Sequence, residues 1–72
     1  STAPSGINCA YTGKLKIGER VCIRPNGQTS DPDVKGVLRY LDQNIIIIDY
    51  EHEDVGMVSI HFPVLGYQLS AL

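Results

Sequence analysis

Four basic side chains in the first half of the chain could together bind an anion: Arg20, Arg24, Lys35 and Arg39. If residues 20–24 and 34–41 form neighbouring strands, alternation gathers these four on one outer face together with Val37. Arginine suits two-pronged contacts with carboxylate or phosphate groups. The sequence therefore predicts either a binding face for an acidic peptide or phosphate, or an ordinary solvated sheet face.

A second candidate is the acidic stretch that follows four consecutive isoleucines: Asp49, Glu51, His52, Glu53 and Asp54. Carboxylates are suitable ligands for hard cations, but this spacing is not that of an EF-hand loop. Strand alternation also divides the acids between two faces. We therefore expect a solvated hairpin tip, with a surface for a basic partner as the alternative, and no metal or cofactor.

Catalysis would need a nucleophile, for which the candidates are a serine or Cys22, which lies between Arg20 and Arg24. No recognised nucleophile motif surrounds it, and a small β domain offers little concave volume. The sequence predicts no enzymatic activity. Cys9 and Cys22 are expected to be free thiols of an intracellular, cytoplasmic domain, although a single bridge between them stays open.

Length and charge limit the choice of function. The 72 residues suit one domain, with a flexible leader over residues 1–6 and a β domain over residues 7–72. All six basic residues lie in the first 39 positions, and five acids without Lys or Arg follow from Tyr40 onward. A pI near 5.4 and few aromatic residues disfavour general nucleic-acid binding. No apolar run approaches the roughly 20 residues of a membrane helix.

Alternating apolar residues predict short strands over residues 20–24, 34–41 and 57–62, and four β-branched isoleucines predict the strand over residues 45–48. Residues 7–12 are expected to form a short strand or an ordered lead-in, and a final strand is expected near the C-terminus. Gly36 is expected to mark a bulge or bend in its strand. Gly36, Leu38 and Tyr40 are expected on one face of that strand. The side chains expected in the core are Val21, Ile23, Leu38, Ile46, Ile48, Tyr50, Val58, Ile60 and Phe62. Ile45 and Ile47 fall on the other face of the central strand, the same outer face as Val37 and Met57. They are either covered by the ends of the chain or form an exposed binding patch.

The segments Leu15-Lys16-Ile17-Gly18-Glu19-Arg20-Val21 and Lys35-Gly36-Val37-Leu38-Arg39-Tyr40 resemble the first half of CAP-Gly domains, and Tudor modules open similarly. Short strands joined by turns predict a small five-stranded SH3-like barrel with a short 3₁₀ turn near the C-terminus, and the resemblance supports this fold. A short OB-fold or Sm-like barrel is the alternative. The Gly-Lys-Asn-Asp-Gly motif of CAP-Gly domains is absent, so no binding residue is carried over.

These observations predict a non-catalytic protein–protein interaction module that binds a peptide, possibly acidic, or a neighbouring domain. A nucleic-acid-binding barrel and a structural subunit of a larger assembly are the alternatives, and the oligomeric state stays open. The predicted binding residues combine the basic face, the outer isoleucines and the tyrosines: Arg20, Arg24, Lys35, Val37, Arg39, Tyr40, Ile45, Ile47, Tyr50 and Tyr67.

Overall fold

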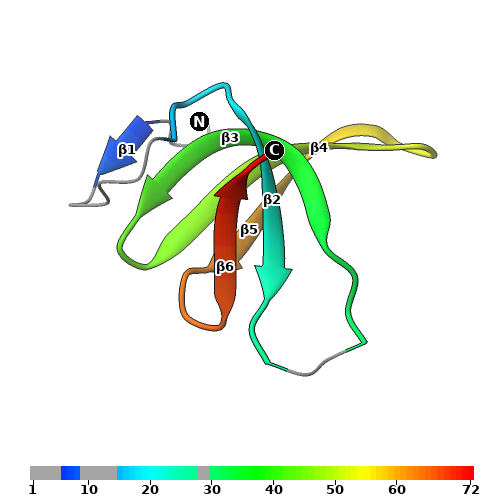
Figure 1. Cartoon of the computed structure of the whole chain (residues 1–72). Helices are drawn as coiled ribbons and strands as arrows, with labels where there is room; N and C mark the ends of the chain where they lie inside the picture. Colours follow the sequence, from blue (N-terminus) through cyan, green and yellow to red (C-terminus); the bar gives the residue numbers. More distant parts are fainter. Residues whose placement is uncertain (1–5, 9–14, 28–29) are drawn as a thin grey trace.

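The structure is a computed structural model in which residues 6–8, 15–27 and 30–72 are described. This part of the chain contains six strands and no helix (Figure 1). The strands are β1 (Gly6–Asn8), β2 (Arg20–Pro25), β3 (Val34–Asp42), β4 (Ile45–His52), β5 (Gly56–Pro63) and β6 (Tyr67–Ala71). The predicted all-β class is confirmed. The predicted leader, apart from Gly6, and residues 9–12 of the first predicted strand lie outside the described residues.

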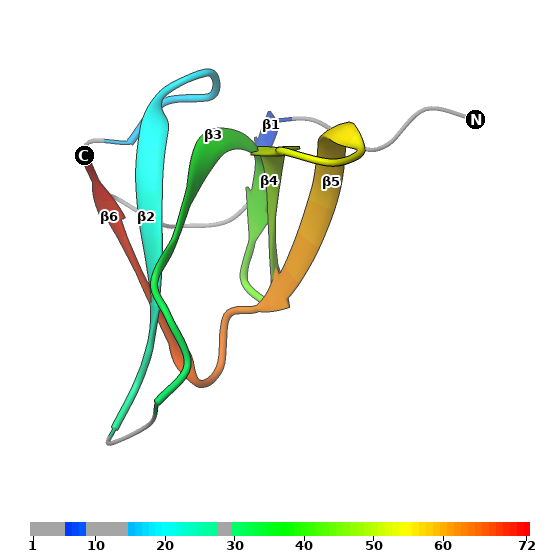
Figure 2. The same ribbon diagram turned by 90° about the vertical axis from the view of Figure 1, so that its right-hand side faces the viewer.

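Five of the strands form one antiparallel sheet in the order β5-β4-β3-β2-β6, and β1 pairs in parallel with the end of β3. The sheet bends strongly along β3, so that β2 and β6 lie across from β4 and β5 (Figure 2). It is not closed, because within the described residues β5 pairs only with β4 and β6 only with β2. No helix in the described residues is long and apolar enough to cross a membrane.

The core lies on the inner face of the bend. Its buried members are Val21, Ile23, Leu38, Leu41, Ile46 and Ile48, each no more than 2% exposed. The predicted alternation is therefore confirmed in β2 and in the first half of β4. The inward side chains of β5 are Val58, Ile60 and Phe62, and they are only half-buried. The core thus thins toward the free edge of β5.

A β-bulge in β3 changes which residues face the core. Leu38 lies opposite Ile48 and Tyr40 lies opposite Ile47, so Arg39 is the extra residue. An extra residue reverses the side-chain alternation beyond it. Leu41 is consequently buried in the core, whereas Tyr40 shares the outer face with Ile47. The expectation that Tyr40 lies on the core face with Leu38 is wrong for this reason.

Gly36 has a different role from the predicted bulge. A Cβ atom at this position would lie 2.5 Å from the carbonyl oxygen of Asp49 and 2.9 Å from Cδ1 of Ile48. Both distances are shorter than van der Waals contact allows. The absence of a side chain therefore lets β3 approach β4 closely, three residues before the bulge at Arg39.

The turn between β3 and β4 is organised by Asp42. Its Oδ1 accepts hydrogen bonds from the backbone amides of Asn44 (2.7 Å) and Ile45 (2.8 Å). The hydroxyl of Tyr40 donates to Oδ2 at 2.7 Å. The Tyr40 hydrogen bond, followed by that of the Asn44 amide, lowers the pKa of Asp42 below its ordinary value because both favour the ionised carboxylate.

The turn before β6 differs from the prediction. The amide of Tyr67 donates to the carbonyl of Val64 at 3.3 Å, and Gly66 has a φ of +97°. A 3₁₀ helix repeats such bonds at negative φ, so the positive φ of Gly66 ends the turn after one bond. The described residues of this segment form a single turn and no 3₁₀ helix.

Candidate functional site

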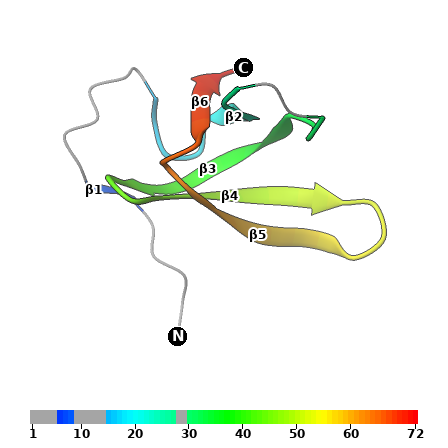
Figure 3. The ribbon, with the colours of Figure 1, turned by 90° about the horizontal axis from the view of Figure 1, so that it is seen from below.

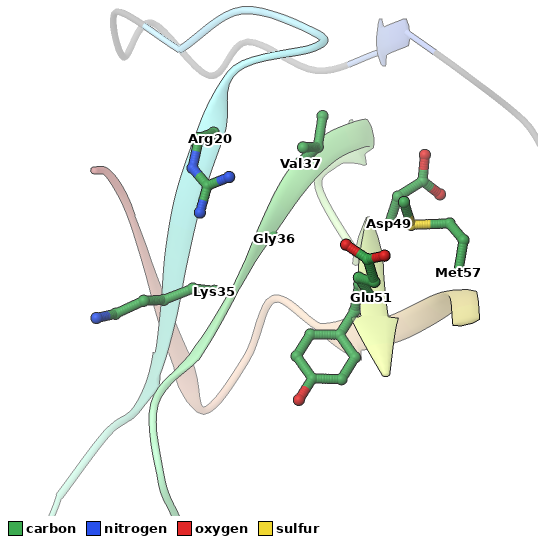
Figure 4. Close-up of a pocket in the computed structure, with 8 residues that line it drawn as sticks. Arg20, Lys35, Gly36, Val37, Asp49, Glu51 and Met57 are labelled. Atoms are coloured by element: carbon green, nitrogen blue, oxygen red, sulfur yellow. The ribbon is translucent and has the colours of Figure 1, made fainter. Parts of the chain in front are cut away.

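A shallow cavity of about 220 Å³ lies on the outer face where β2, β3, β4 and β5 contribute side chains. It is lined by Arg20, Lys35, Gly36, Val37, Asp49, Tyr50, Glu51 and Met57. Arg20 lies opposite Val37, Val37 opposite Asp49, and Glu51 opposite Met57, so strand register brings four strands to one place. Gly36 lies between Lys35 and Val37 on β3, and it lines the cavity with its backbone (Figure 4).

The two sides of the cavity differ in charge. Arg20 and Lys35 come from β2 and β3 on one side, while the carboxylates lie on β4 on the other (Figure 4). Both cations are exposed, and no described residue forms an ion pair with either. An unpaired arginine and lysine at the rim of a cavity are suitable contacts for a carboxylate or phosphate.

The acidic side is partly neutralised from within. Asp49 forms an ion pair with the guanidinium of Arg39, and the Asp49 side chain is 14% exposed. The hydroxyl of Ser59 donates a long hydrogen bond of 3.4 Å to the same carboxylate. Arg39 is therefore occupied, and Glu51 is the exposed acid of the cavity. The positive side remains the less compensated of the two.

The apolar part of the site comes from two side chains. Val37 is half-buried at the centre, and Met57 on the edge strand is 63% exposed. A methionine is flexible and polarizable, so it adapts to different apolar groups. The cavity therefore combines two cations with an adaptable apolar contact, which is a combination suited to a peptide rather than to a bare ion.

Arg24 lies outside this cavity. Its Nε donates to Oδ2 of Asp33 at 3.0 Å, across the base of the β2–β3 loop. This hydrogen bond, together with the charge of Asp33, raises the pKa of Arg24. Arg24 and Arg39 thus form ion pairs within the chain. Of the four residues of the predicted basic face, Arg20 and Lys35 are the two that have no ion pair with a described residue.

The outer isoleucines do not form an open patch. Ile47 is only 1% exposed, and Ile45 is half-buried. The cross-strand neighbours of Ile47 on this face are Tyr40 and His61. Because Ile47 is buried, it is not accessible to a ligand in this structure, which corrects its placement on an exposed binding face.

The predicted tyrosines do not gather in one place. Tyr40 is on the outer face at the Asp42 turn. Tyr67 packs against the core and makes an edge contact with Phe62, with ring centroids 5.2 Å apart. Tyr50 also packs against the core but lines the cavity, so it is the tyrosine that the structure brings to the site.

Cys22 is a free thiol that is 3% exposed. It lies opposite Lys35, so strand alternation places it on the outer face, where it is nevertheless buried. A buried thiol is not accessible to a substrate. No group of three or more possible metal ligands occurs among the described residues. Cys9 lies outside them.

Four lining residues were absent from the predicted site: Gly36, Asp49, Glu51 and Met57. Asp49 and Glu51 stand out in the sequence as part of an acidic cluster and Met57 as part of an outer apolar patch, but nothing in the local sequence joins them to the basic residues. Their common signal is cross-strand register, which places Asp49 beside Val37 and Met57 beside Glu51. Correct pairing of the three strands would have found them.

Neither a model of a known protein family nor a curated protein sequence matches the chain. Among solved structures, a GST-like protein from Pseudomonas syringae matches with a TM-score of 0.80 and 25% sequence identity. The match covers 100% of this chain but 24% of that chain. This chain therefore spans about a quarter of the length of the protein it resembles, and the same sheet occurs there as part of a longer polypeptide.

Proposed function

We propose that this chain is a non-catalytic interaction module built on a small SH3-like barrel, and that it binds an extended acidic peptide in the outer-face cavity. The observation that carries the proposal is that Arg20 and Lys35, beside the exposed Met57, form no ion pair with any described residue. A ligand carboxylate would meet the cations, and an adjacent apolar side chain would cover Val37 and Met57. The sheet order β5-β4-β3-β2-β6 suits an SH3-like barrel.

The length of the GST-like relative supports a role as a module. Its chain is about four times as long as the matched part. We infer that the natural partner is a segment of a neighbouring domain or of another protein, since a small domain with a shallow cavity gains most from binding an extended chain. No activity is carried over from that relative, because the matched part is 24% of its chain.

A nucleic-acid-binding barrel is less favoured. Of the four cations in the predicted basic face, Arg24 and Arg39 pair with Asp33 and Asp49. Stacking on bases needs accessible aromatic rings. Phe62 packs against the core rather than standing on the outer face. These contacts leave two cations for a ligand, which suits one carboxylate better than a run of phosphates.

The test is an NMR titration of the chain with short peptides that contain a carboxylate next to a large apolar residue. Glutamine-substituted peptides serve as ligand controls. Shifts should cluster on Arg20, Val37 and Met57, and the double variant Arg20→Gln/Lys35→Gln should bind roughly tenfold more weakly. Lys16→Gln is the matched control, because Lys16 is an exposed cation outside the cavity.

Peptide shifts that cluster elsewhere would remove the site, and equal binding of acidic and glutamine peptides would remove the proposed role of the cations. The affinity for the peptide is expected to depend only modestly on salt, because one carboxylate makes the charged contact. A strong preference for oligonucleotides over peptides, with affinity falling steeply in salt, would instead favour the nucleic-acid alternative.

A further inference from the structure

The free edge of β5 is unusually regular for an exposed strand. Its eight residues pair with β4 in one continuous register, from Ile45 with Pro63 to His52 with Gly56, without a bulge. Figure 3 shows β5 as the outermost strand beyond β4. Within the described residues no strand pairs with its other side. The unpaired amides and carbonyls on that side are a template for a further strand.

The usual protections of an edge strand are missing here. The sequence from Gly56 to Phe62 has no Lys, Arg, Asp or Glu, and its single proline, Pro63, stands at the end. Proteins normally place charges, prolines, bulges or a short strand at such an edge. The opposite edge, β6, is shorter, with five residues. β6 also lacks charged residues and proline, so its short length is its protection, whereas β5 up to Phe62 has none of the four.

The apolar side chains of β5 also leave area to cover. Val58, Ile60 and Phe62 point inward but are only half-buried, although they belong to the core side of the sheet. A strand added to this edge would extend the same inner face and cover them further. Hydrophobic burial would therefore add to the backbone hydrogen bonds of the new strand pair.

We propose that β5 pairs with β5 of a second copy of this chain, in antiparallel orientation about a twofold axis at Ile60. This register sets Ile60 against its own copy and Val58 against Phe62, so apolar side chains meet on the inner face. On the outer face it sets Ser59 against His61, which are both exposed and able to share a hydrogen bond. The strand is self-complementary in this register.

Charge selects the antiparallel orientation. The end of β4 and the turn to β5 carry the exposed acids Glu51, Glu53 and Asp54, and none of them has an ion pair among the described residues. Antiparallel pairing places the acidic turns of the two copies at opposite ends of the joined strands. Parallel pairing would set them side by side and add repulsion. A second copy therefore fits the edge in one orientation.

This surface is separate from most of the outer-face cavity, with Met57 as the residue on both. Sedimentation of the chain over roughly a hundredfold concentration range tests the pairing. Monomer and dimer should exchange with concentration, and the amides of residues 58–62 should exchange hydrogen more slowly as the dimer fills. The measurement needs no ligand, so its outcome does not depend on the proposed peptide binding.

The double variant Ser59→Lys/His61→Lys places Lys opposite Lys twice across the proposed axis. Both positions are exposed, so the fold should be kept, and dimerisation should weaken by at least roughly tenfold. The matched control is Gln68→Lys/Ser70→Lys, which adds the same charge at exposed positions of β6. It should dimerise as the original chain does.

Three results would overturn self-pairing. One is an original chain that stays monomeric over the whole range. Another is equal weakening by the β5 and β6 variants, which would trace the effect to net charge. The third is slowed exchange of residues 58–62 only when an added peptide is present, which would assign this edge to a strand of another protein.

Discussion

Ile47 and Ile48 are neighbours in β4 and are both buried, yet they are buried on opposite faces. Ile48 is 0% exposed within the core cluster of the inner face. Ile47 is 1% exposed on the outer face and does not belong to that cluster. Of its two cross-strand neighbours, Tyr40 is half-buried and His61 is exposed. The inner face is held by many shared contacts, whereas burial on the outer face is local.

The largest effect should separate these two isoleucines. Ile48→Ala removes a side chain from a densely packed cluster and should lower the free energy of unfolding by about 3–5 kcal/mol. Ile47→Ala should cost about 2 kcal/mol, because its polar and half-buried neighbours can relax into the space. Urea denaturation of both variants measures the difference. Equal losses would mean that the outer face is packed as tightly as the core.

The next largest effect on stability is expected at Gly36, where β3 lies close to β4. Gly36→Ala forces a methyl group toward the Asp49 carbonyl and Ile48 Cδ1. The unfolding free energy should fall by about 1–3 kcal/mol, as in other overpacked sites. Thermal denaturation measures it against Ser70→Ala, an exposed strand position. A neutral Gly36→Ala variant would show that β3 can move away from β4 at little cost.

The inner face was predictable because strand alternation depends only on local order. Val21, Ile23, Ile46 and Ile48 follow a period of two, and the structure buries all four. The alternation failed at Tyr40 because one extra residue, Arg39, reverses it. Nothing in the local sequence marks that residue, since the bulge depends on how β3 fits β4.

The outer-face site was harder to predict for a related reason. Arg20, Lys35 and Val37 follow from alternation and β2–β3 pairing. Asp49 and Met57 enter only through the pairing of β4 with its neighbours. The loss of Arg24 and Arg39 from the site depends on ion pairs with acids nine and ten positions away, which no spacing rule reveals.

The contribution of the Asp42 turn to stability is expected to depend on pH. The pKa of this carboxyl is lowered in the folded chain, mainly by the hydrogen bond from Tyr40. A lowered pKa means that the ionised carboxylate stabilises the fold above the ordinary pKa, near 3.8, and that this stabilisation is lost as pH falls through the lowered folded pKa. Asp42→Asn should therefore be less stable at neutral pH and should approach the original chain in acid.

Thermal melts of the two chains between neutral and acidic pH measure this convergence. Asp54→Asn is the control, because Asp54 is an exposed acid in the β4–β5 turn. Its variant should differ little in stability from the original chain. If the difference at Asp42 were constant with pH, its charge would have no part in holding the turn.

The smallest effect on stability is expected at Met57, where the outer face is open. Met57 is 63% exposed, so Met57→Thr should change the unfolding free energy by no more than about 0.5 kcal/mol. The same change removes the adaptable apolar wall of the cavity and should weaken binding of an acidic, apolar peptide severalfold. Val55→Thr is the control, since Val55 is 69% exposed and does not line the cavity. Urea denaturation and peptide titration on both variants separate the two effects. A large loss of stability in Met57→Thr would mean that the outer face is packed rather than open, and unchanged peptide affinity would remove Met57 from the site.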